Sequence, residues 1–275
     1  MYTKYKALLE TIRPYERAVV AFSGGVDSTL LSYAAAEALG RRNVLCVTAR
    51  AASFPERELS EAADFCAAND IRHEVLDFDE FAVEGFSANP PDRCYRCKHA
   101  LFSKFLQLAE SAGIGAVFEG SNQDDENDYR PGMKAVAELG IKSPLREAGL
   151  AKNDIRQISK MLDLPTWDKQ SFACLASRFV YGETITREKL EMAGRAEQFL
   201  LDRGLRSVRV RIHGTEHYTA RIETEVEDMA SLASEPMRGD VSGFLRKIGF
   251  TYVTLDLTGY RTGSMNEPLR NIKEI

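Results

Sequence analysis

The stretch AVVAFSGGVDS at residues 18–28 decides the expected fold. Its first five residues form a short apolar run, which is typical of a buried parallel strand. Gly24 and Gly25 then allow a tight turn and let backbone N–H groups approach an anion without an intervening Cβ. Ser28 opens a helix whose electropositive amino end favours phosphate. The stretch therefore predicts a phosphate-binding turn between a strand and a helix.

This loop differs from a Walker A sequence, because no GxxxxGK[ST] pattern is present. Asp27 is suited to hold a magnesium ion that bridges phosphates. An ordinary glycine-rich turn is the plain alternative, but a serine, two glycines and an aspartate directly after a strand favour nucleotide binding. The expected nucleotide ligands are the six loop residues Ser23, Gly24, Gly25, Val26, Asp27 and Ser28.

Strands and helices alternate after this loop. Apolar runs and helical spacing predict strands over residues 44–49, 74–78 and 116–119 and helices over residues 29–39, 56–69 and 98–112. This alternation predicts an α/β fold with a doubly wound parallel sheet. Ligands bind such a sheet at the carboxyl ends of its strands, which is where the glycine-rich loop lies.

The pattern changes after about residue 168. Residues 184–203 have one apolar helical face, and residues 206–213 alternate apolar and polar side chains as in a two-sided strand. Further expected elements are strands over 220–223 and 251–257 and a helix over 235–248. We therefore expect a first domain over residues 1–179 and a smaller C-terminal α+β domain over residues 180–275.

The composition excludes several classes of protein. The 275 residues carry a net charge of −5 and are 44% hydrophobic, which is enough apolar material for a buried core. A mildly acidic chain is a poor candidate for nucleic-acid binding, and no apolar run approaches the ~20 residues of a membrane span. The first residues resemble an amphipathic helix rather than an export signal. Together with five cysteines, an odd number, these features favour a cytoplasmic protein with reduced thiols.

A second polar loop, GSNQDDEN, follows the strand expected at residues 116–119. In a doubly wound sheet this loop faces the glycine-rich loop. The residues expected to contact nucleotide or magnesium are Gly120, Asn122, Asp124 and Asp125, with Arg130 near the nucleotide or the substrate. Either aspartate can share a magnesium ion with Asp27. A solvated acidic turn is the plain alternative, because Asn and Asp favour turns.

Three cysteines lie outside the apolar core patterns. Cys94 and Cys97 form a CxxC pair flanked by basic residues, and nearby positive charge favours the thiolate. The pair is compatible with a redox couple, with metal ligands or with chance, and no second CxxC completes a local zinc site. Cys174 lies in an irregular segment beside Arg178; three thiolates suit an iron–sulfur cluster with one open iron, or a nucleophile plus an unrelated pair. The remaining two, Cys46 and Cys66, are expected in the core.

Arginines of the second domain are candidate anion ligands. Arg209 and Arg211 lie two apart on one expected strand, and hence on one face, while Arg261 lies in a glycine-flanked loop. Guanidinium groups bind phosphate or carboxylate through bidentate contacts. Solvated surface arginines paired with local glutamates are the plain alternative. Glu223 and Glu225 share a face of another expected strand, and their spacing does not distinguish a functional role from a structural one.

The order of these motifs resembles the LarE family, the PP-loop sulfur transferases that build the nickel-pincer nucleotide of lactate racemase. The resemblance extends over almost the whole chain through SGGVDS, RCYRCK, GSNQDDENDYRPG, SPLRE, CLASR, RVRIH, ARIE and GYRTGSMN. SGGVDS is the signature of the PP-loop ATP pyrophosphatases, whereas the last four motifs are more specific. The resemblance implies an adenine nucleotide alpha hydrolase-like sheet, ATP and Mg²⁺ as cofactors, and cleavage of ATP between its α and β phosphates.

The family also implies an adenylylating sulfur transferase that acts on a small nucleotide. Its substrate is a pyridinium-3,5-dicarboxylate mononucleotide, whose carboxylate attacks the α-phosphate of ATP. Cys174 matches the sulfur-bearing cysteine, whose thiolate displaces AMP and whose Cβ–S bond then breaks to leave a thiocarboxylate on the product. Arg178, in the same motif, is a further catalytic candidate. The residues carried over to hold the substrate phosphate are Arg209, Arg211 and Arg261, with Glu223 helping to position metal or substrate.

Some members of the family hold a [4Fe-4S] cluster with three cysteines and transfer a hydrosulfide from its free iron. This chain has all three, Cys94, Cys97 and Cys174, so the resemblance favours the cluster form over a sacrificial cysteine. It also suggests a homo-oligomer. Two rival functions stay open. One is a PP-loop tRNA thiolation enzyme, which the acidic balance disfavours; the other is a non-catalytic nucleotide-binding or sulfur-storage protein, which Asp27, Asp125 and Cys174 together disfavour.

Overall fold

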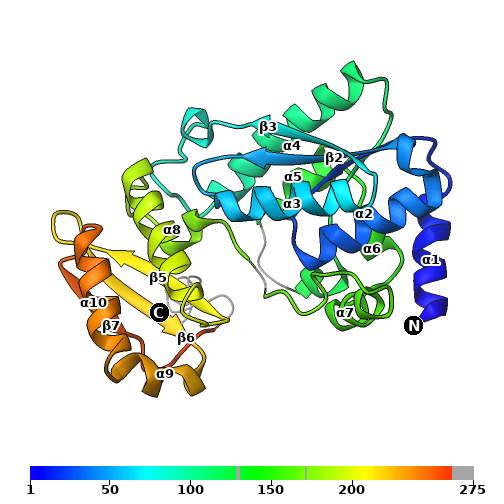
Figure 1. Cartoon of the computed structure of the whole chain (residues 1–275). Coiled ribbons are helices and arrows are strands. Elements are labelled where there is room, and N and C mark those ends of the chain that lie inside the picture. The colour runs from blue at the N-terminus through cyan, green and yellow to red at the C-terminus, as the bar shows by residue number, and fades with distance from the viewer. Residues whose placement is uncertain (128–130, 171, 262–275) are drawn as a thin grey trace. The chain divides into compact units, whose positions relative to one another are not determined.

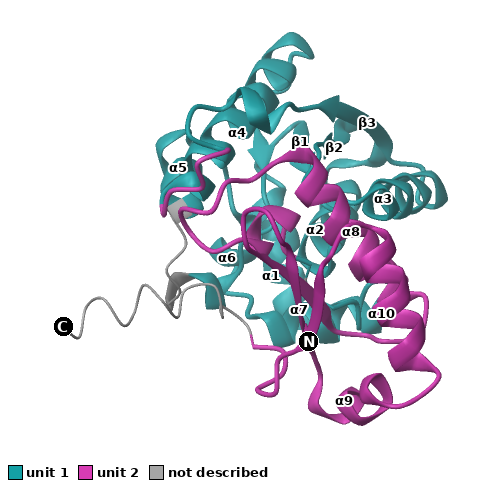
Figure 2. Cartoon of the chain, turned by 90° about the vertical axis from the view of Figure 1, so that its left-hand side faces the viewer, with its two compact units in different colours: residues 1–86, 92–172 teal, residues 87–91, 173–275 magenta. Residues whose placement is uncertain are grey.

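The computed structural model of the chain describes residues 1–127, 131–170 and 172–261. The chain divides into two compact units (Figure 2): unit 1 contains residues 1–86 and 92–172, and unit 2 contains residues 87–91 and 173–275. The division falls before the predicted boundary at residues 179 and 180. The reason is local packing, because the segment around Leu175 contacts the first helix of unit 2 at Gly194.

Unit 1 contains a parallel sheet of four strands in the order β3-β2-β1-β4. The strands are β1 (Ala18–Ala21), β2 (Val44–Arg50), β3 (Arg72–Asp77) and β4 (Val117–Phe118). The chain runs outward from β1 through β2 to β3 and then returns to the other side of β1 as β4. The direction of winding therefore reverses between β1 and β4, and the loops after these two strands flank the crevice where doubly wound sheets bind ligands.

Helices cover both faces of this sheet (Figure 1). Val20 and Cys46 face one group of helices, whereas Val19 and Leu45 face the other, because neighbouring residues of a strand point to opposite sides. The first group contains α1 (Tyr2–Ile12), α2 (Val26–Leu39), α3 (Glu56–Ala68), α6 (Pro144–Glu147) and α7 (Lys152–Met161). The second group contains α4 (Arg93–Ser111) and α5 (Pro131–Glu138). This arrangement confirms the predicted doubly wound α/β fold.

Unit 2 contains a smaller sheet of three strands in the order β5-β6-β7. β5 (Val208–His213) pairs antiparallel with β6 (Thr219–Thr224), which pairs parallel with β7 (Tyr252–Leu255). The helices are α8 (Arg187–Leu201), α9 (Val226–Ala233) and α10 (Met237–Lys247). The apolar face predicted for α8 is buried, including Leu190 and Leu200.

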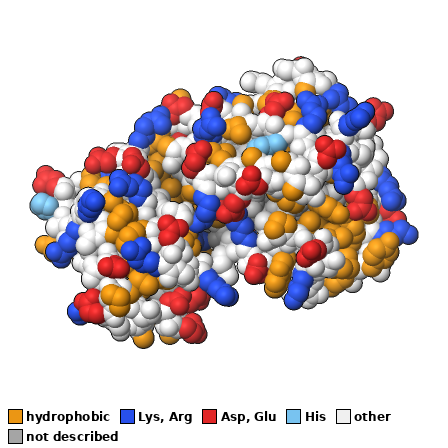
Figure 3. All heavy atoms as spheres, viewed as in Figure 1, with side chains coloured by type: hydrophobic (Ala, Val, Ile, Leu, Met, Phe, Trp, Pro, Cys, Tyr) orange, Lys and Arg blue, Asp and Glu red, His pale blue; other side chains and the backbone are white. Residues whose placement is uncertain are grey.

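The surface and the helices agree with the composition. On the face shown in Figure 3, basic and acidic side chains are interspersed, as a small net charge of −5 leads one to expect. None of the described helices is long and apolar enough to cross a membrane.

Candidate nucleotide and sulfur-transfer site

The glycine-rich loop joins β1 to α2 and requires glycine at its first turn. Gly24 has a φ of +68°, in the left-handed region, and a Cβ there would lie 3.3 Å from the carbonyl oxygen of Glu58 in α3. Gly25 is the N-cap residue of α2, and no side chain caps this helix. The N–H groups of the first turn of α2 are therefore disposed to bind an anion.

The hydroxyl of Ser28 shapes the same loop from inside. It donates to the carbonyl oxygen of Gly25 at 3.1 Å, accepts the backbone N–H of Ser23 at 3.3 Å, and lies 3.1 Å from the hydroxyl oxygen of Ser23. Ser28 is buried, whereas Ser23 is exposed. The two serines thus close the turn on itself, and Ser23 presents its remaining hydrogen-bonding capacity to solvent or to a ligand.

Asp27 lies where the two predicted loops meet. One carboxylate oxygen accepts a hydrogen bond from the Asn122 side chain at 3.3 Å, and the other accepts one from the ammonium of Lys152. A Cβ on Gly120 would lie 3.3 Å from the backbone nitrogen of Ser28, so the loop after β4 packs directly on the first turn of α2. The structure therefore brings both loops to the reversal point of the sheet.

The other two aspartates of this site have backbone partners. Asp125 is buried and accepts the N–H of Asn122 at 2.9 Å, while Asp124 accepts the N–H of Lys152 at 2.8 Å. Magnesium in nucleotide sites takes one or two carboxylates and completes its shell with phosphate and water oxygens. The partly exposed carboxylate of Asp27 fits that donor set, and Asn122 donates to both Asp27 and Asp125. Arg130 lies outside the described residues.

Lys169, which the sequence reasoning missed, links the glycine-rich loop to helix α3. The Lys169 ammonium donates to the carbonyl oxygen of Gly24 at 3.1 Å and to the Glu58 carboxylate at 2.6 Å, and also to Glu61. Only 1% of Glu58 is exposed. A lysine in an irregular polar segment gives no local signal of this role, because its partners lie on a distant helix.

The CxxC pair lies in the first two turns of α4. This helix begins at Arg93, earlier than the predicted residue 98, because Pro91 and Asp92 provide a helix start. A Cβ on Gly132 would lie 3.3 Å from the sulfur of Cys94, so the start of α5 packs on that thiol. Cys94 and Cys97 are both partly buried.

Cys174 belongs to unit 2 and directly precedes the 3₁₀ turn Leu175–Arg178. A three-cysteine cluster requires three thiolates in one place, and unit 1 offers two, one helical turn apart. Within the described part of the chain, no group of three or more His, Cys, Asp or Glu side chains is gathered to hold a metal ion. The cluster therefore stays a prediction.

The other two cysteines lie in the core of unit 1. Cys46 and Cys66 are fully buried, in agreement with their apolar sequence patterns. A hydrogen bond to the Cys66 thiol, together with burial, raises the pKa of Cys46 well above its ordinary value. Cys46 is thus held protonated and is not a reactive thiolate.

The arginines of β5 are buried, which contradicts the interpretation as solvated surface groups. Arg211 makes a bidentate contact with Glu223, at 3.1 and 2.8 Å, and also donates to the carbonyl oxygen of Ser177 at 2.6 Å. Burial, with the positive charge of Arg178 nearby, lowers the pKa of Arg209. Glu223 lies on the neighbouring strand β6, directly opposite Arg209 and diagonal to Arg211, so its contact with Arg211 is a diagonal cross-strand pair.

Arg178 is tied to the helix that follows it. Its guanidinium contacts both carboxylate oxygens of Glu197 in α8, at 2.6 and 2.9 Å, and donates to the Ser177 hydroxyl at 2.6 Å. Only 1% of Arg178 is exposed. Glu197 also accepts the N–H of Val210 at 2.8 Å, so this pair fixes the segment after Cys174 against β5. Sequence reasoning missed Glu197, because it lies among surface-type charges on a helix.

Arg261 and Glu225 are the remaining candidates of unit 2. Arg221 contacts Glu223 at 2.9 Å and also pairs with Asp256, and Arg261 lies 3.8 Å from the same aspartate. Glu225 does not share the strand face of Glu223, as the sequence had suggested, because β6 ends at Thr224 and Glu225 is the N-cap residue of α9.

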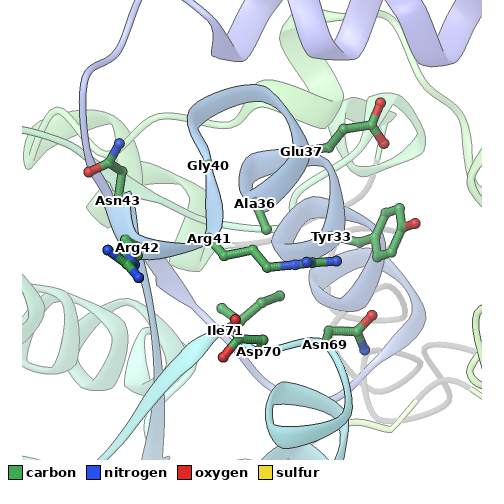
Figure 4. Close-up of a pocket in the computed structure, with 10 residues that line it drawn as sticks. All are labelled: Tyr33, Ala36, Glu37, Gly40, Arg41, Arg42, Asn43, Asn69, Asp70 and Ile71. Atoms are coloured by element: carbon green, nitrogen blue, oxygen red, sulfur yellow. The ribbon is translucent and has the colours of Figure 1, made fainter.

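A pocket of about 540 Å³ lies at the opposite, amino-terminal edge of the unit 1 sheet (Figure 4). Arg41 and Arg42 line it together with Glu37 and Asp70. The pocket adjoins the carboxyl ends of α2 and α3, where helix dipoles are negative. None of the lining residues belongs to the amino end of an α-helix, whereas the glycine-rich loop leads directly into the amino end of α2.

Comparison with known proteins gives matches to the nucleotide part and to the whole chain. The NAD synthase family matches residues 6–92, which include the glycine-rich loop. The NH(3)-dependent NAD(+) synthetase of Methanococcoides burtonii is 28% identical over 158 residues, covering 54% of this chain and 58% of that protein.

Two further relatives match from end to end. An uncharacterized protein of Synechocystis is 42% identical over 265 residues, which cover 95% of this chain and 97% of that protein. The pyridinium-3,5-bisthiocarboxylic acid mononucleotide synthase of Lactiplantibacillus plantarum is 36% identical over 267 residues, which cover 97% of this chain and 95% of that enzyme. The similarity thus includes both units.

Proposed function

Because the chain belongs to the family of the pyridinium-3,5-bisthiocarboxylic acid mononucleotide synthases, we propose that it is an ATP-dependent sulfur transferase. Its proposed reaction converts a carboxylate of a pyridinium dicarboxylate mononucleotide to a thiocarboxylate, for nickel-pincer cofactor synthesis. The observation that carries this proposal is the 36% identity over 97% of the chain. The SGGVDS loop at the reversal point of the sheet supports the ATP-dependent step.

The first proposed step activates the substrate carboxylate. A carboxylate oxygen attacks the α-phosphorus of ATP, and the bond from that phosphorus to the bridging oxygen breaks, so that its electron pair leaves with pyrophosphate. The uncapped amino end of α2, with the N–H groups of the loop that precedes it and the Ser23 hydroxyl, stabilises the phosphate charge. Magnesium, when bound, neutralises further charge on the phosphates. Asp27 would hold it, together with Asp125.

Unit 2 is proposed to bind the phosphate of the substrate. Arg209, Arg211 and Arg261 are the candidate ligands, and arginine suits phosphate because its planar fork donates two parallel hydrogen bonds. Glu223 keeps the Arg211 guanidinium in one orientation through its bidentate contact. Arg178 acts as a positioning residue, because its guanidinium is committed to Glu197 and Ser177.

The second proposed step transfers sulfur from Cys174. Its thiolate attacks the carbonyl carbon of the acyl adenylate and displaces AMP, giving a thioester. Loss of the Cα proton of Cys174 then breaks the Cβ–S bond, and the electron pair of that bond stays on sulfur. The products are a thiocarboxylate and a dehydroalanine at position 174. A [4Fe-4S] cluster held by Cys94, Cys97 and Cys174 is the alternative sulfur source, and we assign no step to it.

The test incubates the purified protein with ATP, Mg²⁺ and the pyridinium dicarboxylate mononucleotide. We expect AMP, pyrophosphate and a product in which sulfur replaces one oxygen, detected by mass spectrometry. The peptide that contains Cys174 should lose the mass of hydrogen sulfide once for each sulfur transferred, and Cys174→Ser should give no thiolated product. Absence of pyrophosphate release from ATP in the presence of this substrate would contradict the proposed function.

The cluster alternative has its own readout. Iron and acid-labile sulfide are measured per chain after anaerobic purification, for the wild type and for Cys94→Ala. About four of each, lost in the variant and accompanied by several turnovers per chain, would assign the sulfur source to a cluster. Iron-free protein with one turnover per chain assigns it to Cys174.

A further inference from the structure

Tyr260 lies against Arg209, one of the proposed ligands of the substrate phosphate. The central carbon of the Arg209 guanidinium is 5.1 Å from the centroid of the tyrosine ring. Arg209 is buried, whereas Tyr260 is partly exposed, so the ring is the more accessible member of this pair. A ligand that binds Arg209 therefore has an aromatic ring beside it.

Backbone contacts fix the position of this ring. The N–H of Tyr260 donates to the carbonyl oxygen of Thr224 at 2.8 Å, and the N–H of Gly259 donates to that of Asp256 at 3.1 Å. Gly259 has a φ of +77°, and a Cβ there would lie 3.0 Å from the Thr224 oxygen, so this loop passes close to the end of β6. The Tyr260 hydroxyl makes no hydrogen bond to any residue that the structure describes. Its removal leaves no such partner unsatisfied, which makes phenylalanine a mild replacement.

The charge around Arg209 suits one end of the proposed substrate and not the other. Burial lowers the pKa of Arg209, and the positive charges of Arg178 and Arg211 lower it further. Such surroundings attract a phosphate but repel a cationic pyridinium ring. An electron-rich aromatic face attracts a cation that lies within about 6 Å of its centroid. One ribose joins the ring to the phosphate, so a phosphate bound to Arg209 brings the pyridinium within reach of Tyr260.

We propose that Tyr260 is a specificity-determining residue that binds the cationic ring of the substrate. One face of the tyrosine contacts Arg209, and the pyridinium binds the other face while the phosphate neutralises the arginine. This contact selects a positively charged ring over a neutral ring of nearly the same shape, because only the charged ring is attracted to the π-system. The inference rests on the proposed function and adds the residue that recognises the pyridinium.

The experiment compares two ligands that differ in ring charge. They are the pyridinium dicarboxylate mononucleotide and its 1,4-dihydro form, whose ring is neutral, and their binding is measured by isothermal titration calorimetry without ATP, so that no reaction occurs. The wild type should bind the cationic form about tenfold more tightly. This preference should fall below about threefold in Tyr260→Leu and stay near tenfold in Tyr260→Phe.

Tyr218→Leu is the matched control. Tyr218 also lies beside a cation, with the Lys189 ammonium 5.2 Å from its ring centroid, but it precedes β6 at the end opposite to Thr224. Its replacement should leave both affinities unchanged.

Two results overturn the inference. The first is equal weakening of both ligands in Tyr260→Leu with the preference kept, which would mean that the tyrosine only positions Arg209. The second is equal binding of the two ligands by the wild type. In either case the release of pyrophosphate from ATP decides separately on the proposed function, which does not require the ring charge to be distinguished.

Discussion

Lys169 donates a 2.6 Å hydrogen bond to Glu58, whose carboxylate is buried beneath the glycine-rich loop. The same ammonium lies 3.1 Å from the carbonyl oxygen of Gly24. One lysine therefore joins three parts of unit 1: helix α3, the turn that precedes α2, and the segment that leads toward residue 172. Arg57 contacts the other oxygen of Glu58 at 3.2 Å from the solvent side.

Replacing Lys169 by Met should destabilise unit 1, because it leaves a buried carboxylate with only a peripheral partner. We expect a loss of about 3 kcal/mol in the free energy of unfolding, measured by urea denaturation. Lys134→Met is the control, because its pair with Glu138 is exposed and should contribute less than about 1 kcal/mol. Adding Glu58→Gln to Lys169→Met should restore part of the stability, because the unpaired charge is then gone.

Equal stability of Lys169→Met and Lys134→Met would contradict this account. It would mean that water or Arg57 satisfies Glu58 without the lysine.

The conformation of Gly24 gives a prediction about nucleotide binding. Gly24 and Gly140 have nearly the same φ, +68° and +66°. Replacing either glycine by alanine should therefore lower the free energy of unfolding by about 1–2 kcal/mol, because of backbone strain. A Cβ on Gly24 meets the backbone oxygen of Glu58 at 3.3 Å, whereas a Cβ on Gly140 meets nothing within 4 Å. ATP affinity, measured by isothermal titration calorimetry, should therefore fall in Gly24→Ala and stay unchanged in Gly140→Ala. Unchanged affinity in both variants would separate the loop from ATP binding.

Local patterns predicted the fold well, because the elements of unit 1 carry their own signals. The apolar run before Gly24, the helix that follows and the alternation of strands and helices are all properties of short segments. The start of α4 could also have been found, since Pro91 and Asp92 are a recognised helix start. The strand order was not specified by any one segment, because it depends on which strands pair.

The site was less predictable for the same reason. Lys169 meets Glu58 across 111 positions of the chain, and Lys152 meets Asp27 across 125. Neither lysine lies in a motif, so only the folded chain joins them. The alternation of valine and arginine in β5 suggested a half-exposed strand. Arg209 and Arg211 are nevertheless buried, and the Glu223 carboxylate of β6 pairs with Arg211. Burial of a charge depends on partners that its own segment does not contain.

The proposed phosphate site in unit 2 can be tested by changing the substrate. If Arg209 binds the substrate phosphate, Arg209→Gln should raise the KM for the mononucleotide at least tenfold, because a charge-assisted contact contributes about 1.5–3 kcal/mol. The KM for the dephosphorylated nucleoside should be the same in the variant and in the wild type. Arg203→Gln is the control. Arg203 is an arginine of the same unit that lies over the ring of Phe199 and is not a proposed phosphate ligand, so its replacement should leave the KM unchanged. An equal rise in KM for both substrates would indicate a structural role for Arg209.

His213 should make the stability of unit 2 depend on pH. Its Nε2 accepts a hydrogen bond from Arg221 at 3.1 Å, so the ring is neutral at that nitrogen. Burial, followed by the positive charges of Arg221 and Arg211, lowers the pKa of His213 below its ordinary value of about 6.5. The unfolded chain then binds a proton more readily than the folded chain. Stability is therefore complete above pH 6.5 and decreases as the pH falls from there toward the lowered folded pKa.

The measurement is the melting temperature between pH 7.5 and 5 for the wild type and His213→Gln. The variant should melt at nearly the wild-type temperature at pH 7.5. Its melting temperature should fall less than that of the wild type between pH 7.5 and pH 5, because glutamine does not titrate. Burial also lowers the pKa of His73, so part of the decrease should persist in the variant. Burial raises the pKa of Glu183, which lies 3.9 Å from His213 and contributes a slope of opposite sign. The exposed His217 provides the control His217→Gln. Parallel pH profiles of the wild type and His213→Gln would show that His213 does not take part in this dependence.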